Sequence, residues 1–350
     1  MIGSNLGPDT PGRRRRLPVL LSLAAVTAAR CSSVALLPPT TRPGEASNVA
    51  VLGATAYVAM GESGLGVLDV PTGRMIRVLT PPRPAGSVDD VSVADGLLFA
   101  LDARKPGYLA VFSIAQPTAP ALRSGPLPVP VEPFAGVSAG GGRVVVSGGT
   151  SALTVASYDT SGRLLPDRVE LDLGRGQPDV LLSPDGGVAY VSTHFSLLNR
   201  SYGLTLLRLS APPGASAPMA TLELTGAGFT PGASKPANFA LETALAKGVL
   251  LAAFGDGLAV VDVSDPRRPR LLQVVKLPVR PVNVDVLGAH AAVVGSDPDP
   301  TLILLSLSDP RTPRVERVVK LPARSRPLGV AMSETRVVVA AKNGPMVVDR

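Results

Sequence analysis

Acidic and amide side chains recur at one place in the sequence, a few residues after a proline, where a hydrophobic run begins. They are Asn48, Asp90, Asp179, Asn238 and Asn283. If these side chains converge on one axis, their oxygen atoms could hold a Ca²⁺ ion or an ordered cluster of water molecules. Carboxylates are few even when the adjacent Asp89 is included. The pattern therefore equally fits a polar, water-filled channel, and we assign no cofactor.

A second group of residues stands directly before these prolines and is mostly basic. Its members are Arg83, Glu132, Gln177, Lys235, Arg280 and Arg326. If the four cations lie on one face, they form a positive rim that attracts anions. The alternative is a set of solvated side chains beside rigid turns. We call these six residues the basic rim.

No set of residues has the composition of a catalytic centre. Two histidines, His194 and His290, and one cysteine, Cys31, are too few for a zinc site or an internal disulfide. His194 lies in an inserted segment and could act as a general base, although an exposed loop histidine is the simpler interpretation. Asp262 is better explained by an orienting hydrogen bond inside a strand, and Asp265 by a Ser-Asp-Pro turn. We therefore assign no catalytic residue.

Short strands that repeat along the chain would have to position these candidates. Glycine and proline number 36 each, with valine-rich runs between them, which is typical of an all-β protein. The strand that contains Asp262 has counterparts that contain Asp69, Ser113, Ser157, Arg208, Ser306 and Asp349. Their spacing of about 44 residues matches a four-stranded propeller blade. Residues 32–350 are therefore predicted to form a seven-bladed β-propeller. Six or eight blades are the alternatives if the longer units contain an extra hairpin.

The last unit ends after its third strand, so its outer strand must come from elsewhere. An open ring would leave an unpaired strand edge. The apolar segment SSVALL, residues 32–37, stands just before the first unit. We expect this segment to supply the missing strand and close the ring.

The stretch GLAVVDVSDPRRP, residues 257–269, resembles the repeat of bacterial LVIVD-repeat β-propellers. TLILLSLSDPRTP, residues 301–313, is similar, and GLGVLDVPTG, residues 64–73, is partly so. The middle units have diverged and lack the Asp-Pro pair. The resemblance implies an exported, often surface-associated propeller, and it implies no shared catalytic residue.

Residues 1–31 have the pattern of an export signal. Four arginines, Arg13 to Arg16, precede the 13-residue apolar run from Leu17 to Ala29. Small residues allow cleavage after Ala28. Lipidation of Cys31 is the rival mode of export, although Arg30 departs from the usual lipoprotein pattern. Either mode predicts a periplasmic, cell-surface or secreted protein.

The charge of the chain bears on its partners. The net charge is +7, of which residues 1–31 hold +4, from five arginines and one aspartate. The chain has no tryptophan and no aromatic-interleaved basic run, so a nucleic-acid partner is not expected.

We expect a non-enzymatic scaffold that docks an envelope protein or an anionic polymer on the face of the channel mouth. The alternative is a lactonase-type hydrolase that uses Asp90, Asp179, Glu132 and His194.

Overall fold

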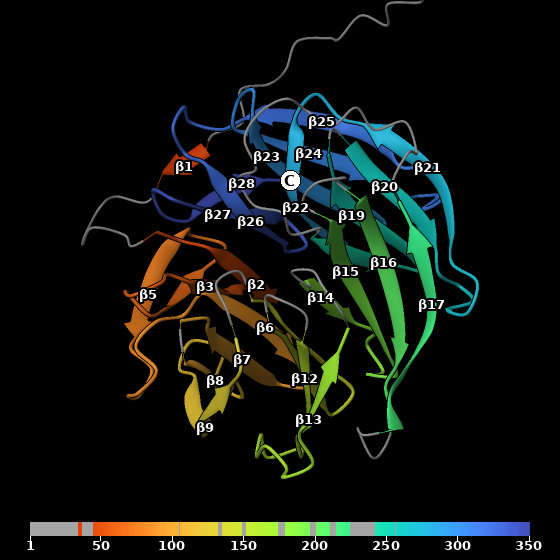
Figure 1. The fold of residues 1–350 in the computed structure, drawn as a ribbon. Helices are drawn as coiled ribbons and strands as arrows, with labels where there is room; N and C mark the ends of the chain where they lie inside the picture. The colour runs from red at the N-terminus through yellow and green to blue at the C-terminus, as the bar shows by residue number, and fades with distance from the viewer. Residues whose placement is uncertain are drawn as a thin grey trace, which may run out of the picture. The chain divides into compact units, whose positions relative to one another are not determined.

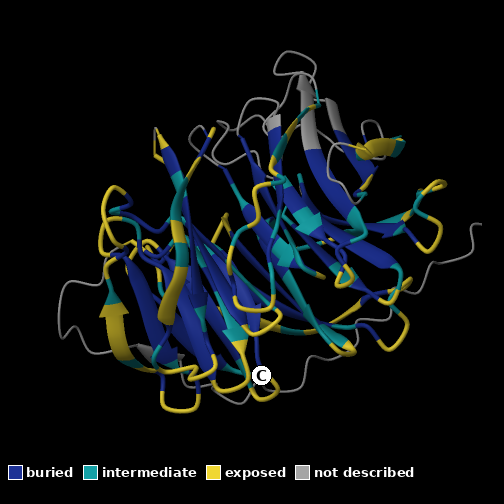
Figure 2. Cartoon of the chain, turned by 90° about the horizontal axis from the view of Figure 1, so that it is seen from below, coloured by how far each residue is buried: buried dark blue, intermediate teal, exposed yellow. Residues whose placement is uncertain are grey.

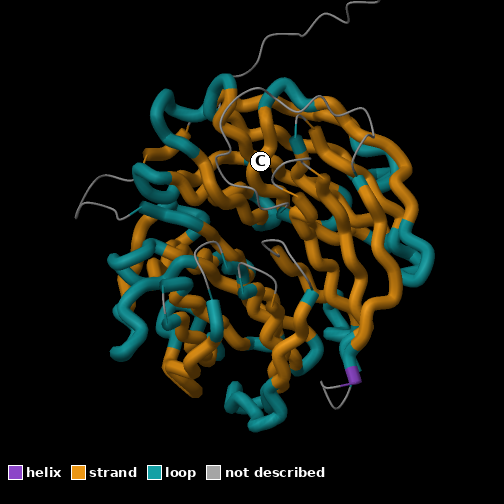
Figure 3. Tube along the Cα trace, viewed as in Figure 1, coloured by secondary structure: helices purple, strands orange, loops and turns teal. Residues whose placement is uncertain are grey.

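The computed structural model contains seven four-stranded antiparallel sheets arranged as the blades of a β-propeller (Figure 1). The structure describes residues 34–36, 45–104, 106–131, 135–148, 152–173, 179–196, 201–210, 215–224, 242–255 and 257–350. The blades belong to one compact unit, Ser33–Arg350. Strands dominate the described chain (Figure 3). The predicted all-β fold with seven blades is confirmed.

Within each blade the strands follow one another from the channel outward. Blade 1 contains β2 (Asn48–Leu52), β3 (Thr55–Ala59), β4 (Leu65–Asp69) and β5 (Arg74–Leu79). Blade 2 contains β6 (Asp90–Ala94), β7 (Leu97–Asp102), β8 (Gly107–Ser113) and β9 (Ala121–Val129). Blade 3 contains β10 (Val137–Gly140), β11 (Arg143–Ser147), β12 (Ala152–Ser157) and β13 (Val169–Asp172). Blade 4 contains β14 (Asp179–Leu182), β15 (Val188–Ser196), β16 (Ser201–Arg208) and β17 (Ala217–Glu223).

The last three blades follow the same order, except for the final strand. Blade 5 contains β18 (Thr243–Ala246), β19 (Val249–Phe254), β20 (Gly257–Asp262) and β21 (Arg270–Lys276). Blade 6 contains β22 (Arg280–Leu287), β23 (His290–Asp297), β24 (Thr301–Ser306) and β25 (Arg314–Lys320). Blade 7 contains β26 (Pro327–Met332), β27 (Arg336–Ala341), β28 (Met346–Asp349) and β1 (Val34–Leu36). All seven repeat anchors lie in third strands, as predicted, and each proves to be the last residue of its strand.

The hydrophobic core is divided among the seven interfaces between neighbouring blades. Each interface holds its own cluster of buried side chains, such as Phe99 and Val146 between blades 2 and 3. The second strands are covered on both faces, and every residue of β3, β7 and β19 is buried. Figure 2 shows the buried strands inside and the exposed residues mainly in the loops. Burial on both faces explains why the sequence shows continuous apolar runs instead of alternation.

Strand β1 closes the ring as predicted. It pairs antiparallel with β28, with Val34 opposite Val348 and Leu36 opposite Met346. The inner strand β2 of the first blade also lies against β26 of the last blade. The N-terminal and C-terminal ends of the propeller therefore share one blade.

The Ser-Asp-Pro segments form turns, as the sequence indicates. The Asp265 carboxylate accepts a hydrogen bond from the backbone N–H of Arg267 at 3.0 Å. Asp262 lies at the end of β20, where its carboxylate forms an ion pair with Arg311 of the next blade at 2.9 Å. The side-chain amide of Gln273 donates to the backbone carbonyl of Arg311 at 2.7 Å. The repeated residues thus shape turns and connect adjacent blades.

No helix in the described part of the chain is long and apolar enough to cross a bilayer.

Deleting residues 32–40 from the full chain should destabilise the propeller, because the edge of β28 loses its partner. We expect the free energy of unfolding to fall by roughly 1–3 kcal/mol. Denaturant unfolding followed by circular dichroism measures this change. A deletion of residues 3–11, equal in length, serves as the control, and equal stability of the two deletion variants would contradict closure by β1.

Candidate functional site

Each blade places one residue, within its inner strand or directly before it, at an equivalent position around the channel. In every blade the inner strand is followed by a turn, and the residue in question lies five positions before the first residue of that turn. In blade 2, for example, Asp90 lies five residues before the turn at Asp95. The seven positions, which we call the channel ring, are Asn48, Asp90, Gly136, Asp179, Glu242, Asn283 and Gly329.

Four of the five polar residues predicted for this ring lie on it. They are Asn48, Asp90, Asp179 and Asn283. The fifth, Asn238, lies outside the described residues, and the strand register gives its position in blade 5 to Glu242. The turn Lys247–Gly248 that fixes this register has positive φ at both residues. A Lys-Gly pair is a weak hairpin signal beside Asn-Gly or Asp-Gly, which is why the sequence alignment placed blade 5 four residues too early.

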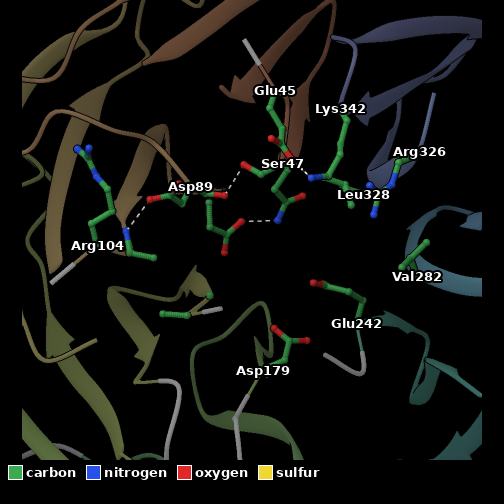
Figure 4. A pocket seen from close by; sticks show the side chains of 15 residues that line it. Glu45, Ser47, Asp89, Arg104, Asp179, Glu242, Val282, Arg326, Leu328 and Lys342 are labelled. Atoms are coloured by element: carbon green, nitrogen blue, oxygen red, sulfur yellow. Dashed lines mark hydrogen bonds and ion pairs between the residues drawn. The ribbon is translucent and has the colours of Figure 1, made fainter. Parts of the chain in front are cut away.

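A cavity of about 460 Å³ opens at the channel mouth (Figure 4). All seven blades contribute to its lining. The lining residues are Glu45, Ser47, Asn48, Asp89, Asp90, Ala103, Arg104, Ala135, Gly136, Asp179, Glu242, Val282, Arg326, Leu328 and Lys342. We call this space the mouth cavity. Its volume lies within the range of small-ligand pockets, roughly 300–1,000 Å³.

Asp90 is held by donors from three blades. Its carboxylate accepts hydrogen bonds from the side-chain amide of Asn48 and from the backbone N–H groups of Val91 at 2.8 Å and Val137 at 2.6 Å. The last of these N–H groups belongs to the inner strand of the next blade. Burial raises the pKa of Asp90 to about 6, although the three hydrogen bonds oppose this rise. Part of the polarity of the ring is therefore structural.

The same use of polar side chains recurs two residues further along the inner strands. The Asp285 carboxylate accepts from the backbone N–H of Met332 at 2.7 Å. The Ser138 hydroxyl accepts from the backbone N–H of Leu182 at 2.9 Å. The inner edges of these sheets carry N–H groups without a strand partner, so side chains of the preceding blade satisfy them. Burial raises the pKa of Asp285 to about 6.

Asp179 and Glu242 differ from Asp90 because they have fewer donors around them. Both are partly exposed and face the mouth cavity (Figure 4). Burial, and then repulsion from Asp90, raise the pKa of Asp179 to about 7, and the backbone N–H of Val180 only partly offsets this. Burial and the negative charges of Asp179 and Asp90 also raise the pKa of Glu242 well above its ordinary value.

Asp89 lines the cavity, but its carboxylate has structural partners. It accepts from the backbone N–H of Ala103 at 2.8 Å and from the hydroxyl of Ser87 at 3.2 Å. Arg104 is paired with Asp102 at 3.0 Å, and Lys342 with Glu45 at 2.6 Å. Sequence reasoning missed Glu45, Arg104 and Lys342 because they reach the mouth from loops that carry no repeated signal.

Three of the basic-rim residues can be placed, and the other three, Glu132, Gln177 and Lys235, lie outside the described residues. Arg83, Arg280 and Arg326 all stand in or directly after connections from an outer strand to the next inner strand. Such connections share one end of the propeller, so the three lie on the mouth face. Arg326 lines the mouth cavity, whereas Arg83 and Arg280 do not.

The backbone position of His194 and the contacts of His290 can be described. His194 is opposite Tyr202 in the long hairpin of β15 and β16. His290 begins β23, and its ring contacts the Glu316 carboxylate at 3.2 Å. Cys31 lies outside the described residues. Within the described residues, no group of three or more His, Cys, Asp or Glu side chains is arranged to hold a metal ion.

Comparisons with known proteins agree with the architecture. The LVIVD repeat family model matches residues 43–71 and 250–276. No curated protein matches the chain. Of the solved structures, 1283 chains match, and one of them belongs to the crystal structure of the mitotic checkpoint complex. That chain is 12% identical, with a TM-score of 0.62 over 92% of this chain and 99% of its own length, so the likeness concerns the fold alone.

The raised pKa values predict that the propeller loses stability as the pH rises. In the unfolded chain these carboxyl groups titrate near pH 4. The folded chain keeps their protons up to about pH 6 to 7, so it binds more protons in this window and its free energy of unfolding falls with increasing pH. The double variant Asp179→Asn, Glu242→Gln should lose less stability between pH 5 and pH 8 than the unmodified chain, by roughly 1–3 kcal/mol.

Urea unfolding at both pH values measures this difference. Asp309→Asn, in an exposed turn between third and fourth strands, is the control and should keep the pH dependence of the unmodified chain. If the free energy of unfolding changes equally with pH in the double variant and in the unmodified chain, the raised pKa values are not those of Asp179 and Glu242.

Together, the fold and the two matched segments identify the chain as a seven-bladed β-propeller that carries LVIVD repeats.

Proposed function

We propose that this protein is an exported, non-enzymatic scaffold that docks a protein of the cell envelope on the mouth face of its propeller. The observation that carries the proposal is the mouth cavity, to which all seven blades contribute. A site built from every blade depends on the closed ring and is held by the rigid inner strands. The proposal of export rests on the signal pattern of residues 1–31.

The charge of the mouth favours a protein partner over an anionic polymer. Within the described part of the chain, the lining contains five carboxyl groups, those of Glu45, Asp89, Asp90, Asp179 and Glu242. Its three cations are Arg104, Arg326 and Lys342, and two of these form ion pairs with carboxylates. Among the described lining residues, carboxyl groups outnumber cations and most cations are already paired, so a polyanion finds few free partners there. A protein can present basic side chains to the cavity and acidic ones to Arg83 and Arg326.

A hydrolase is the second candidate, and the proximity of Asp90 and Asp179 favours it. A carboxyl group with a pKa near neutrality suits a general acid or base. Against it, Asp90 is occupied by three hydrogen-bond donors. A hydrolase would show turnover of a model lactone that Asp179→Asn abolishes.

A pull-down from envelope extract with covalent cross-linking tests the docking proposal. The tagged full chain is compared with two variants. The acidic-site variant combines Asp179→Asn with Glu242→Gln, and the triple arginine variant combines Arg83→Ala, Arg280→Ala and Arg326→Ala. We expect a specific protein to be captured by the unmodified chain and by the Asp309→Asn control, and its recovery to fall roughly tenfold with the acidic-site variant.

Two outcomes would count against this version of the proposal. Loss of capture only with the triple arginine variant would assign binding to the basic rim. Capture of an anionic polymer, in place of a protein, would reverse the charge argument.

A further inference from the structure

Three carboxylates from three blades meet in the mouth cavity at the point where the channel begins. Asp90 comes from blade 2, Asp179 from blade 4 and Glu242 from blade 5. Asp179 and Glu242 face the same open space (Figure 4). Their negative charges act on one another, since Asp90 affects both Asp179 and Glu242. We call these three residues the acidic triad.

Gly136 of blade 3 allows two members of the triad to approach each other. A Cβ atom at this position would lie 3.1 Å from Oδ1 of Asp179 and 3.4 Å from Oδ2 of Asp90. It would also lie 3.5 Å from the hydroxyl oxygen of Ser147. A longer side chain at Gly136 would therefore fill the space between the two carboxylates. The glycine leaves that space open to the cavity.

The cations around the cavity are mostly engaged with other carboxylates. Arg104 pairs with Asp102 and lies 3.7 Å from Glu62, and Lys342 pairs with Glu45. The exposed Arg326, on blade 7, is the third cation of the lining. In the described part of the chain, the negative charge of Asp89 also acts on Asp90 and raises its pKa. Among the described residues, no ion pair neutralises a member of the triad.

The repulsion among these three carboxylates can be relieved in two ways. At acid pH the triad takes up protons, which removes the repulsion and the cost of holding charge away from water. At higher pH the protons leave, and an external cation is needed to offset that cost. The pKa values of about 6 for Asp90 and about 7 for Asp179 place the exchange at these two groups near neutrality, and the pKa of Glu242 is raised as well.

An organic cation fits the cavity better than a metal ion. The described carboxylates are not arranged as a metal site. The volume of about 460 Å³ exceeds the needs of a single bare ion and suits a small organic group. Planar guanidinium groups bind carboxylates through several parallel hydrogen bonds, which matches carboxylates that approach from different blades.

We propose that the mouth cavity binds an arginine or lysine side chain of the docked protein in exchange for protons held by the acidic triad. This inference rests on the proposed docking function and adds its ligand chemistry and its regulation. Docking is then tight at neutral or alkaline pH and is released on acidification.

Calorimetric titration of the full chain with acetyl-arginine amide tests the exchange. Titrations are run at about pH 5.5 and about pH 8, in buffers of different ionisation enthalpy. We expect roughly tenfold tighter binding at the higher pH, with protons released to the buffer near neutrality. Asp179→Asn, Glu242→Gln should bind weakly at both pH values, and Asp309→Asn should behave as the unmodified chain.

A variant that fills the space between Asp90 and Asp179 without changing any charge gives an independent test of probe binding. Gly136→Ala should weaken binding of the probe at pH 8, and its circular dichroism spectrum reports whether the propeller is folded. Equal affinity for the probe at both pH values would overturn the exchange. So would binding of Ca²⁺, but not of the arginine derivative, at the triad.

The outcome separates this inference from the docking proposal. A partner protein captured equally at both pH values, with no affinity for the arginine probe, would leave docking intact and overturn the exchange. Absence of any partner would overturn the docking proposal, whatever the probe binds.

Discussion

Each blade of this propeller must bury both faces of its sheet, and it can do so only between two neighbours. The seven apolar clusters lie one at each interface between blades, and the second strands β3, β7 and β19 are buried along their whole length. A missing blade or an open ring would expose two such faces to water. The packing of blade 7 against blade 1 covers the last two faces, and the pairing of β1 with β28 completes the outer edge of blade 7.

Closure of the ring also leaves backbone groups at the channel that need hydrogen-bond partners. Seven inner strands converge on one axis and leave N–H groups without strand partners. Asp90, Ser138 and Asp285 accept hydrogen bonds from such groups in the next blade. Carboxylates used in this way are removed from water, so their pKa values rise and their charge becomes dependent on pH. The carboxylates that satisfy the backbone N–H groups of the inner strands thus also make the charge of the channel depend on pH.

Much of the fold was predictable because a propeller repeats its constraints. All seven predicted anchor residues lie in third strands, and the segment containing Val34–Leu36 pairs where the sequence indicated. Asp265 forms the predicted turn because its role is local. Repetition carries this information even where individual units have diverged.

The site was less predictable, because it depends on register and on loops. Glu242 occupies the channel ring as a result of a two-residue turn at Lys247 that the sequence signals weakly. Arg104 and Lys342 reach the mouth from single loops, and the repeat does not mark them. A residue that only one blade possesses has no counterpart from which its position can be inferred.

The central claim is that the channel-mouth carboxyl groups keep protons near neutrality. Titration of ¹³C-labelled carboxyl groups by NMR measures this directly, with Asp90→Asn, Asp179→Asn and Glu242→Gln used to assign the signals. The account predicts midpoints at about pH 6 for Asp90 and about pH 7 for Asp179, with Glu242 well above its ordinary range. Midpoints near pH 4 for all three, as in an unfolded chain, would contradict it.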